Sequence, residues 1–450
     1  MNIKQLLPLS LLLLSAAALR AQETKLSLDE AINLAVTKST EATLADTKVA
    51  TSKLEVDNVK NNVYPSLKVS GSYLRVSDPT LNLKVPLGSS SGTDSGSGTA
   101  TASPTVNSAM YGFANASMPL FSGFKLKNSI AASENAYKAE TYSAAGTKEQ
   151  MALQTIMLYT NLYKAQQSVT LIEENLKSAR QRVKDFTAME QNGLIARNDL
   201  LKAQLQSSNV ELSLEDAKKT VAVLNYQLVT LLHLPEGTKV GVNDSYFKNS
   251  GNLNPAVTEN EAIAQRNDLQ ALRFAEKAAE SNIKIAKADY YPTIGLSAGY
   301  VYLNVPHFVE LYNAANVGIG VSYDIAGIFK NNKKVKAAES RRQETRQQLD
   351  LLTENVKVQV QQSLENYNLA VKQNRVYTEA VTQAGENYRI VKDKYDNGLS
   401  DTNDLLEADV QQLQARLNET FSRADITWRY YELLNASGKL TSSFNLTQNK

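Results

Sequence analysis

Residues 192–203 read Asn-Gly-Leu-Ile-Ala-Arg-Asn-Asp-Leu-Leu-Lys-Ala, and residues 397–408 read Asn-Gly-Leu-Ser-Asp-Thr-Asn-Asp-Leu-Leu-Glu-Ala. The shared residues of the two stretches are 398 − 193 = 205 positions apart. Long amphipathic segments flank each copy, so each Asn-Gly pair is predicted to end one helix shortly before the next begins. The sequence therefore predicts two long helical hairpins, an arrangement that suits a duplicated tube or rod better than an enzyme active site.

Residues 1–21 have the composition of a secretory signal peptide. Lys4 supplies the positive charge, residues 6–14 form the apolar segment, and small residues suit cleavage after Ala18 or Ala21. Removing residues 1–21 takes away Lys4 and Arg20, so the formal net charge falls from +2 to 0. A neutral chain gives no electrostatic reason to expect a nucleic-acid partner.

The chain contains no cysteine, which excludes disulfides, thiolate metal sites and a lipidated N-terminal cysteine. Beyond the predicted signal peptide, no run of about 18 apolar residues occurs, as an ordinary transmembrane helix would require. An exported chain of this kind is expected to be periplasmic, secreted or a membrane barrel.

A first structural repeat is predicted over residues 22–240. Ser27 and Glu30 have the spacing of a capping box, so a helix should begin there, and Tyr64-Pro65 should end the helical region. Alternating residues then predict strands over about 65–75 and 108–121. Residues 88–104 contain only Gly, Ser, Thr, Ala, Asp and Pro, and predict an exposed loop between them. A very long helix follows, with its hairpin turn near residue 193.

A linker is predicted over 241–257 and a second repeat over 258–438. Thr258 and Glu261 again have capping-box spacing, and Tyr291-Pro292 precedes the next strand. The two strands are predicted over about 292–303 and 316–326. The later strand has one apolar face, made of Val317, Ile319, Val321, Tyr323 and Ile325. The hairpin turn lies near 398, and residues 439–450 are predicted to form a mobile polar tail.

The predicted strands have about ten residues, one apolar face and aromatic residues near their ends. This combination is typical of transmembrane β-strands, although a half-buried strand of a soluble sheet shows the same alternation. No other segment offers cover for four apolar strand faces. Because four strands cannot close a barrel in lipid, the chain should oligomerise through them, and two, three or four copies would give about 8, 12 or 16 strands.

The order and duplicated spacing of these elements resemble the TolC-like outer membrane efflux protein family. The resemblance covers nearly the whole chain after residue 21, including the two Tyr-Pro strand starts and the paired Gly-Leu turns. It implies a mixed fold of α-helices and transmembrane β-strands, in which a trimer forms a 12-stranded β-barrel continued by a long periplasmic α-helical barrel. It also implies an outer membrane exit duct of a tripartite efflux or type I secretion system. Such a duct exports drugs, small molecules or proteins together with a periplasmic adaptor protein and an inner-membrane pump.

Asp404 and Glu407 lie three residues apart at the start of the final helix, and therefore on one helix face. The resemblance places an acidic constriction here, with Tyr395 close to it. We therefore predict that Tyr395, Asp404 and Glu407 line a closed periplasmic gate, where clustered carboxylates would favour cations. The alternative is an ordinary acidic helix start, which the helix dipole favours without any pore.

Gly193, Leu194, Gly398 and Leu399 are the predicted adaptor-docking residues. An exposed leucine at a turn suits contact with a partner's helical hairpin, although Asn-Gly-Leu is also common chemistry for closing a helix. Family members often carry a basic residue two positions after the glycine, where this chain has Ser400. A charged latch at that position is therefore not expected.

No catalytic residue, metal site or cofactor is predicted. His233 and His307 are the only histidines, one at a helix end and one in a loop. The principal alternative function is a soluble periplasmic coiled-coil scaffold or adaptor protein, in which the four strands form a small globular sheet. Such a scaffold would have to bury the apolar strand faces, whereas a duct would expose them to the lipid of the outer membrane.

Overall fold

The computed structural model describes residues 23–77, 106–248, 257–306 and 308–444. The predicted signal peptide, the 88–104 loop and His307 lie outside these residues. The chain divides into a sheet unit, Ser52–Tyr137 with Phe274–Arg346, and a hairpin unit, Met1–Thr51 with Lys138–Arg273 and Gln347–Lys450. Among the helices described, none combines the length and apolar character needed to cross a membrane.

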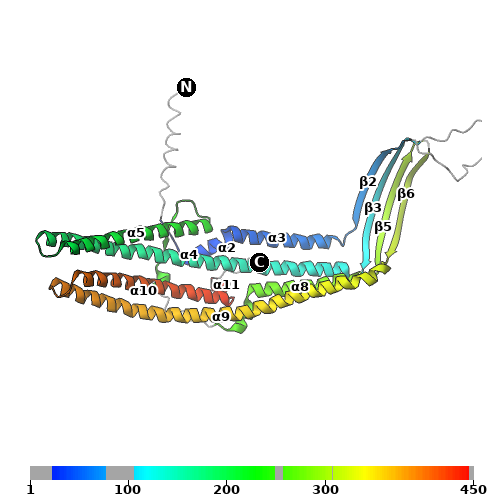
Figure 1. Cartoon of the computed structure of the whole chain (residues 1–450). Coiled ribbons are helices and arrows are strands. Elements are labelled where there is room, and N and C mark those ends of the chain that lie inside the picture. Colours follow the sequence, from blue (N-terminus) through cyan, green and yellow to red (C-terminus); the bar gives the residue numbers. More distant parts are fainter. Residues whose placement is uncertain (1–22, 78–105, 249–256, 307, 445–450) are drawn as a thin grey trace, which may run out of the picture. The chain divides into compact units, whose positions relative to one another are not determined.

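The sheet unit contains a four-stranded antiparallel sheet (Figure 1). Its order is β2-β3-β5-β6, so β3 and β5 join the two sequence repeats at the centre and β2 and β6 form the edges. The strands are β2 (Ser66–Arg75), β3 (Ser108–Ser122), β5 (Thr293–Val305) and β6 (Val309–Ser322). The first three lie within two residues of their predicted bounds. A register shift near Pro119 marks a bulge, as expected where a residue cannot donate a ladder hydrogen bond.

The predicted bounds of the fourth strand, 316–326, are wrong at both ends. Helix α9 (Ile325–Asp396) begins at Ile325, so Tyr323 and Ile325 do not belong to the strand. The Asp324 side chain accepts a 2.9 Å hydrogen bond from the Gly327 N–H and starts the helix in spite of the apolar alternation. The strand also begins earlier, at Val309. A bulge at Asn313, whose φ is +58°, lets the strand continue across the point where the alternating sequence pattern breaks.

Gly123 makes the turn from β3 into α4 (Lys125–Gln191). Its φ is +61°, and a Cβ at this position would lie 2.5 Å from the Ala288 carbonyl oxygen. Both facts require glycine here. The turn therefore fixes the end of the strand against the end of α8 (Asn267–Ala288).

We expect Gly123→Ala to lower the free energy of unfolding by at least about 2 kcal/mol, because it adds both backbone strain and a clash. Thermal unfolding followed by circular dichroism measures this change. Gly146→Ala is the matched control, since Gly146 is helical and its added Cβ would lie no closer than 3.8 Å to Asn267. This control should be neutral or slightly stabilising. Equal losses for the two variants would contradict the argument.

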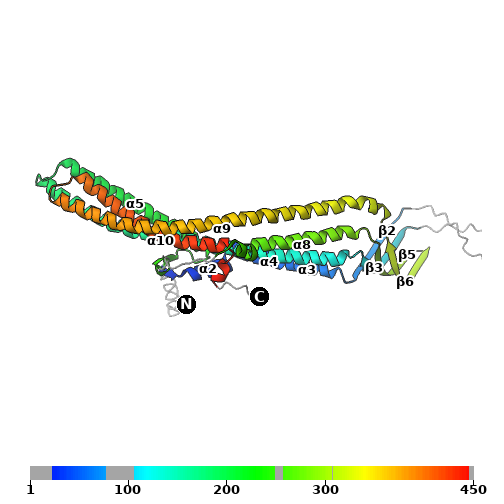
Figure 2. The same ribbon diagram turned by 90° about the horizontal axis from the view of Figure 1, so that it is seen from below.

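The hairpin unit is built from two helical hairpins, α4–α5 and α9–α10, whose turns lie at the same end of the unit (Figure 2). The return helices are α5 (Arg197–Leu231) and α10 (Thr402–Ala436). Shorter helices accompany them, among them α2 (Leu28–Lys38), α3 (Thr40–Asn61, which continues into the sheet unit) and α7 (Glu259–Gln265). The capping boxes predicted at Ser27 and Thr258 are both confirmed.

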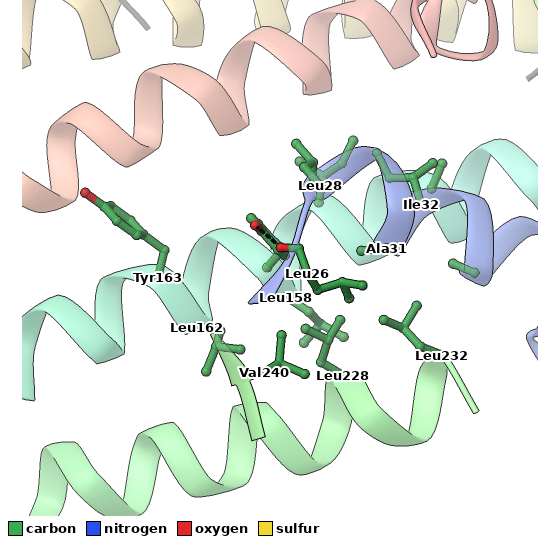
Figure 3. Close-up of a cluster of buried hydrophobic side chains, with 14 of the residues drawn as sticks. Leu26, Leu28, Ala31, Ile32, Leu158, Leu162, Tyr163, Leu228, Leu232 and Val240 are labelled. Carbon is green, nitrogen blue, oxygen red and sulfur yellow. Dashed lines mark hydrogen bonds between the residues drawn. The ribbon is translucent and has the colours of Figure 1, made fainter. Parts of the chain in front are cut away.

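The largest core of the hairpin unit lies where the N-terminal segment meets α4 and α5 (Figure 3). Leu28 and Ile32 of α2 pack with Leu162 of α4 and Leu228 of α5, all of them buried. The Tyr159 hydroxyl donates to the Leu26 carbonyl oxygen and accepts from the Asn243 N–H. This tyrosine therefore ties two distant chain segments to α4.

Part of the predicted linker, 241–257, is not a linker. Strand β4 (Lys239–Val242) pairs in parallel with β1 (Glu23–Leu26), and α6 (Ser245–Lys248) follows. Phe247 of α6 is fully buried and stacks on Tyr163 with ring centroids 4.0 Å apart. Such short elements give no periodic signal, because only the distant partner strand stabilises them.

The first part of the predicted polar tail, 439–450, is also packed. Helix α11 (Leu440–Ser443) buries Leu440, and Phe444 stacks on Tyr431 with ring centroids 5.1 Å apart. The Thr441 hydroxyl donates to the Glu149 carboxylate on α4. Burial raises the pKa of Glu149 above its ordinary value. Residues 445–450 lie outside the described part of the chain.

Candidate functional site

The two hairpin turns have the same backbone geometry. The N–H groups of Gly193 and Leu194 donate to the carbonyl oxygens of Glu190 and Met189, at 2.9 and 2.8 Å. The corresponding bonds from Gly398 and Leu399 have the same two lengths. Both glycines have positive φ, +72° and +70°, as this way of closing a helix requires. The predicted turns are confirmed.

The leucine that follows each glycine points into solvent. Leu194 is 71% exposed and Leu399 is 77% exposed. A helix end of this type usually places this residue in contact with the last helical turn, which would bury it. Closing the helix therefore does not account for two exposed leucines at equivalent positions.

Asp404 and Glu407 are both exposed at the start of α10. Asp404 accepts a 2.7 Å hydrogen bond from the Ser400 hydroxyl, and Glu407 accepts a 3.0 Å bond from the Gln411 amide. Among the described residues, neither carboxylate forms an ion pair. In the first repeat the equivalent residues, Asp199 and Lys202, form an ion pair with 3.6 Å between nitrogen and oxygen. The uncompensated acidic pair thus belongs to the second hairpin alone.

Tyr395 contacts the first hairpin and forms no hydrogen bond with the acidic pair. Its ring stacks on Phe186 with centroids 5.7 Å apart, in a cluster that also contains Leu200 and Leu405. Its hydroxyl is buried and has no hydrogen-bond partner among the described residues. The tyrosine therefore joins the turn regions of the two hairpins within one chain.

A buried ion pair between the two hairpins was missed by the sequence analysis. Arg182 of α4 donates to the Asp409 carboxylate of α10 at 3.2 Å, and their side chains are only 10% and 5% exposed. Arg182 also donates to the Tyr388 hydroxyl of α9, and the Asn175 amide donates to Asp409. Burial disfavours the charge on Arg182, but the hydrogen bond and charge of Asp409, together with Tyr388, outweigh burial and hold the pKa of Arg182 above its ordinary value. One sequence feature could have indicated this buried pair: Asp409 lies next to Ala408, within the apolar stripe of α10.

We expect Asp409→Ala to lower the free energy of unfolding by about 3–5 kcal/mol, because it leaves the Arg182 guanidinium buried and unpaired. Chemical denaturation of the purified protein measures this loss. Replacing both partners, Arg182→Met with Asp409→Leu, should recover most of it. As a control, Asp393→Ala breaks an exposed pair with Arg389 and should cost less than about 1 kcal/mol.

No group of three or more His, Asp or Glu side chains among the described residues is placed to hold a metal ion. His233 lies at the end of α5 with a φ of +50°, and its Nε2 atom lies 3.1 Å from the Thr40 hydroxyl. The side chain is exposed, and this contact connects the end of α5 to the start of α3.

Comparisons with known proteins identify the family of this chain and proteins with a similar fold. The outer membrane efflux protein family profile matches residues 45–232 and 259–439, which cover both repeats. Outer membrane efflux protein BepC of Brucella suis is 24% identical over 331 residues, which are 72% of this chain and 71% of BepC. Outer membrane protein TolC of Vibrio cholerae is 23% identical over 318 residues, which are 69% of this chain and 72% of TolC.

Among solved structures, CusC superimposes with a TM-score of 0.77 at 18% identity, covering 94% of this chain and 95% of CusC. At this identity the likeness establishes the fold. The profile match over both repeats establishes the family, and it excludes the soluble scaffold that the sequence left open. The chain belongs to the outer membrane efflux protein family, and it is an outer membrane efflux channel with a large periplasmic helical part.

Proposed function

We propose that this protein is the exit duct of a tripartite efflux or type I secretion system, in which three chains form a 12-stranded barrel and a periplasmic helical barrel. One observation carries the proposal: the four-stranded sheet has two unpaired edges, and both edge strands are exposed along nearly their whole length. In lipid, each unpaired backbone group costs several kcal/mol. A sheet of this kind needs partner strands at both edges.

A ring of chains meets this need. If β6 of one chain pairs with β2 of the next, the same contact repeats around an axis and leaves no edge open. The apolar side chains on β6 suit the lipid-facing surface of such a barrel, since Val317, Ile319 and Val321 are all more than two-thirds exposed. The intervening Gly318, Gly320 and Ser322 would face the interior. The number three rests on the family resemblance.

In this proposal Asp404 and Glu407 line the periplasmic gate. A trimer would bring six carboxylates together, and the absence of an ion pair for either residue within the described chain supports this role. Tyr395 acts differently from the carboxylates, by holding the second hairpin against Phe186 of the first. Opening the gate would then require this contact to change.

Leu194 and Leu399 are proposed to dock a periplasmic adaptor protein, which in turn connects the duct to an inner-membrane pump. The two leucines have the same turn geometry and nearly the same exposure, so a partner would meet two equivalent contacts per chain. Cargo would be drugs, other small molecules or proteins.

The decisive test combines the mass of the detergent-purified oligomer with conductance in a planar lipid bilayer. We expect a trimer that opens discrete channels of low resting conductance. A monomer or dimer that forms no channels would overturn the proposed assembly. A channel-forming oligomer of two or four chains would support the duct function but would show that the barrel does not have 12 strands.

A further inference from the structure

The helix-bearing end of the sheet carries exposed aromatic side chains next to each of the four strands. Register pairs Thr293 with both Ser122 and Ser322, and Ser66 lies at the same end of β2. Tyr64, Phe124, Tyr291 and Tyr323 lie within two residues of these positions and are all at least 45% exposed, and Phe329 lies near the start of α9. Aromatic residues concentrate where a membrane barrel meets the polar interface. Given the proposed function, this end marks the periplasmic boundary of the membrane.

Lysines cluster directly beyond these aromatic residues. Residues 325–338, at the start of α9, contain four lysines and no acidic residue, and Lys125 and Lys127 begin α4. Two of these lysines are ion-paired, since Lys125 and Lys334 share the Asp289 carboxylate, at 3.0 and 3.3 Å. The remaining four are exposed and form no ion pair within the described residues: Lys127, Lys330, Lys333 and Lys336. We call these four the lysine collar.

We propose that the lysine collar binds the phosphate groups of anionic phospholipids in the membrane leaflet that faces the periplasm. Three features together point to this partner. The collar carries uncompensated positive charge, its lysines have long stems that can reach a headgroup, and it adjoins aromatic residues at the end of the apolar strands. Phe329 lies beside Lys330 and is 84% exposed, which suits contact with lipid at the same depth.

The test compares lipid binding to the detergent-purified full-length protein, measured by native mass spectrometry with added phosphatidylglycerol or phosphatidylcholine. The collar variant replaces Lys127, Lys330, Lys333 and Lys336 with glutamine. Its matched control replaces four other exposed lysines of the same two helices, none with an ion pair among the described residues: Lys184, Lys357, Lys372 and Lys394. Both variants lose the same charge from the same helices.

We expect the unaltered protein to prefer phosphatidylglycerol and to lose this preference at high salt. The collar variant should bind phosphatidylglycerol at least roughly tenfold more weakly, because each lysine near a membrane surface contributes about a fivefold factor. The control variant should bind it normally, and both variants should retain their oligomer and conductance.

Unchanged phosphatidylglycerol binding by the collar variant would overturn the proposal. So would a change of conductance or ion selectivity without loss of lipid, because the lysines would then line the duct. Displacement of phosphatidylglycerol by equimolar lipopolysaccharide or free inorganic phosphate would equally exclude a phospholipid site. This inference rests on the proposed function, but the two proposals fail on different results. If the unaltered protein forms no channels, the proposed duct function is wrong. If it forms channels but shows no preference for phosphatidylglycerol, only the proposed lipid binding by the lysine collar is wrong.

Discussion

Replacing Leu194 and Leu399 together with aspartate is expected to abolish efflux while leaving the assembled protein in the outer membrane. The two side chains are 71% and 77% exposed, so replacing them removes little buried surface. A carboxylate at each turn would place charge in an apolar contact with the adaptor, and burying an unpaired charge costs several kcal/mol. Cellular drug accumulation, together with oligomer mass from membrane extracts, measures both parts of this prediction.

The matched control for the turns is Leu212→Asp, since Leu212 is also 71% exposed but lies within α5. Efflux should remain close to that of the unaltered protein. If the double turn variant fails to assemble, the leucines have a structural role and the docking proposal is wrong. If it assembles and exports normally, the adaptor docks elsewhere.

Replacing Asp404 and Glu407 together with alanine is expected to remove cation block and change the resting conductance. The change removes six carboxylates from a trimer, and each removed charge weakens attraction for a cation in the aperture. A loss of only about 1.4 kcal/mol already reduces the affinity of a blocking cation tenfold. Single-channel recording with a divalent cation added on the periplasmic side measures both quantities.

A control removes two carboxylates from elsewhere on the second hairpin. Glu354 and Glu379 lie on α9, are exposed and form no ion pair among the described residues. Their joint replacement with alanine should leave block by the cation unchanged. Identical behaviour of the two double variants would favour the alternative for Asp404 and Glu407, in which an acidic helix start serves only the helix dipole.

Some features of this protein follow from local chemistry that a sequence displays directly. A glycine with positive φ closes each long helix, so the two Asn-Gly-Leu stretches located both hairpin turns. Capping boxes at Ser27 and Thr258 set helix starts within a few residues. The alternation of apolar and polar residues predicted three strands to within two residues of their bounds. The duplicated order of helices and strands indicated the family.

Other features depended on contacts between segments far apart in the chain. Strand β4 exists because β1 pairs with it, and α11 is held by the buried Leu440, so neither shows a periodicity of its own. The buried position of Asp409 depends on Arg182, which lies 227 residues away. The stacking of Tyr395 on Phe186 likewise requires both hairpins to be folded.

The sequence by itself therefore determined the order of helices and strands and the two turns, because these depend on residues within a few positions of one another. The tertiary structure alone decided which charges are buried, which short segments are ordered and which lysines lack a partner. Those properties arise when hydrophobic burial brings distant segments together, and no local pattern records the result.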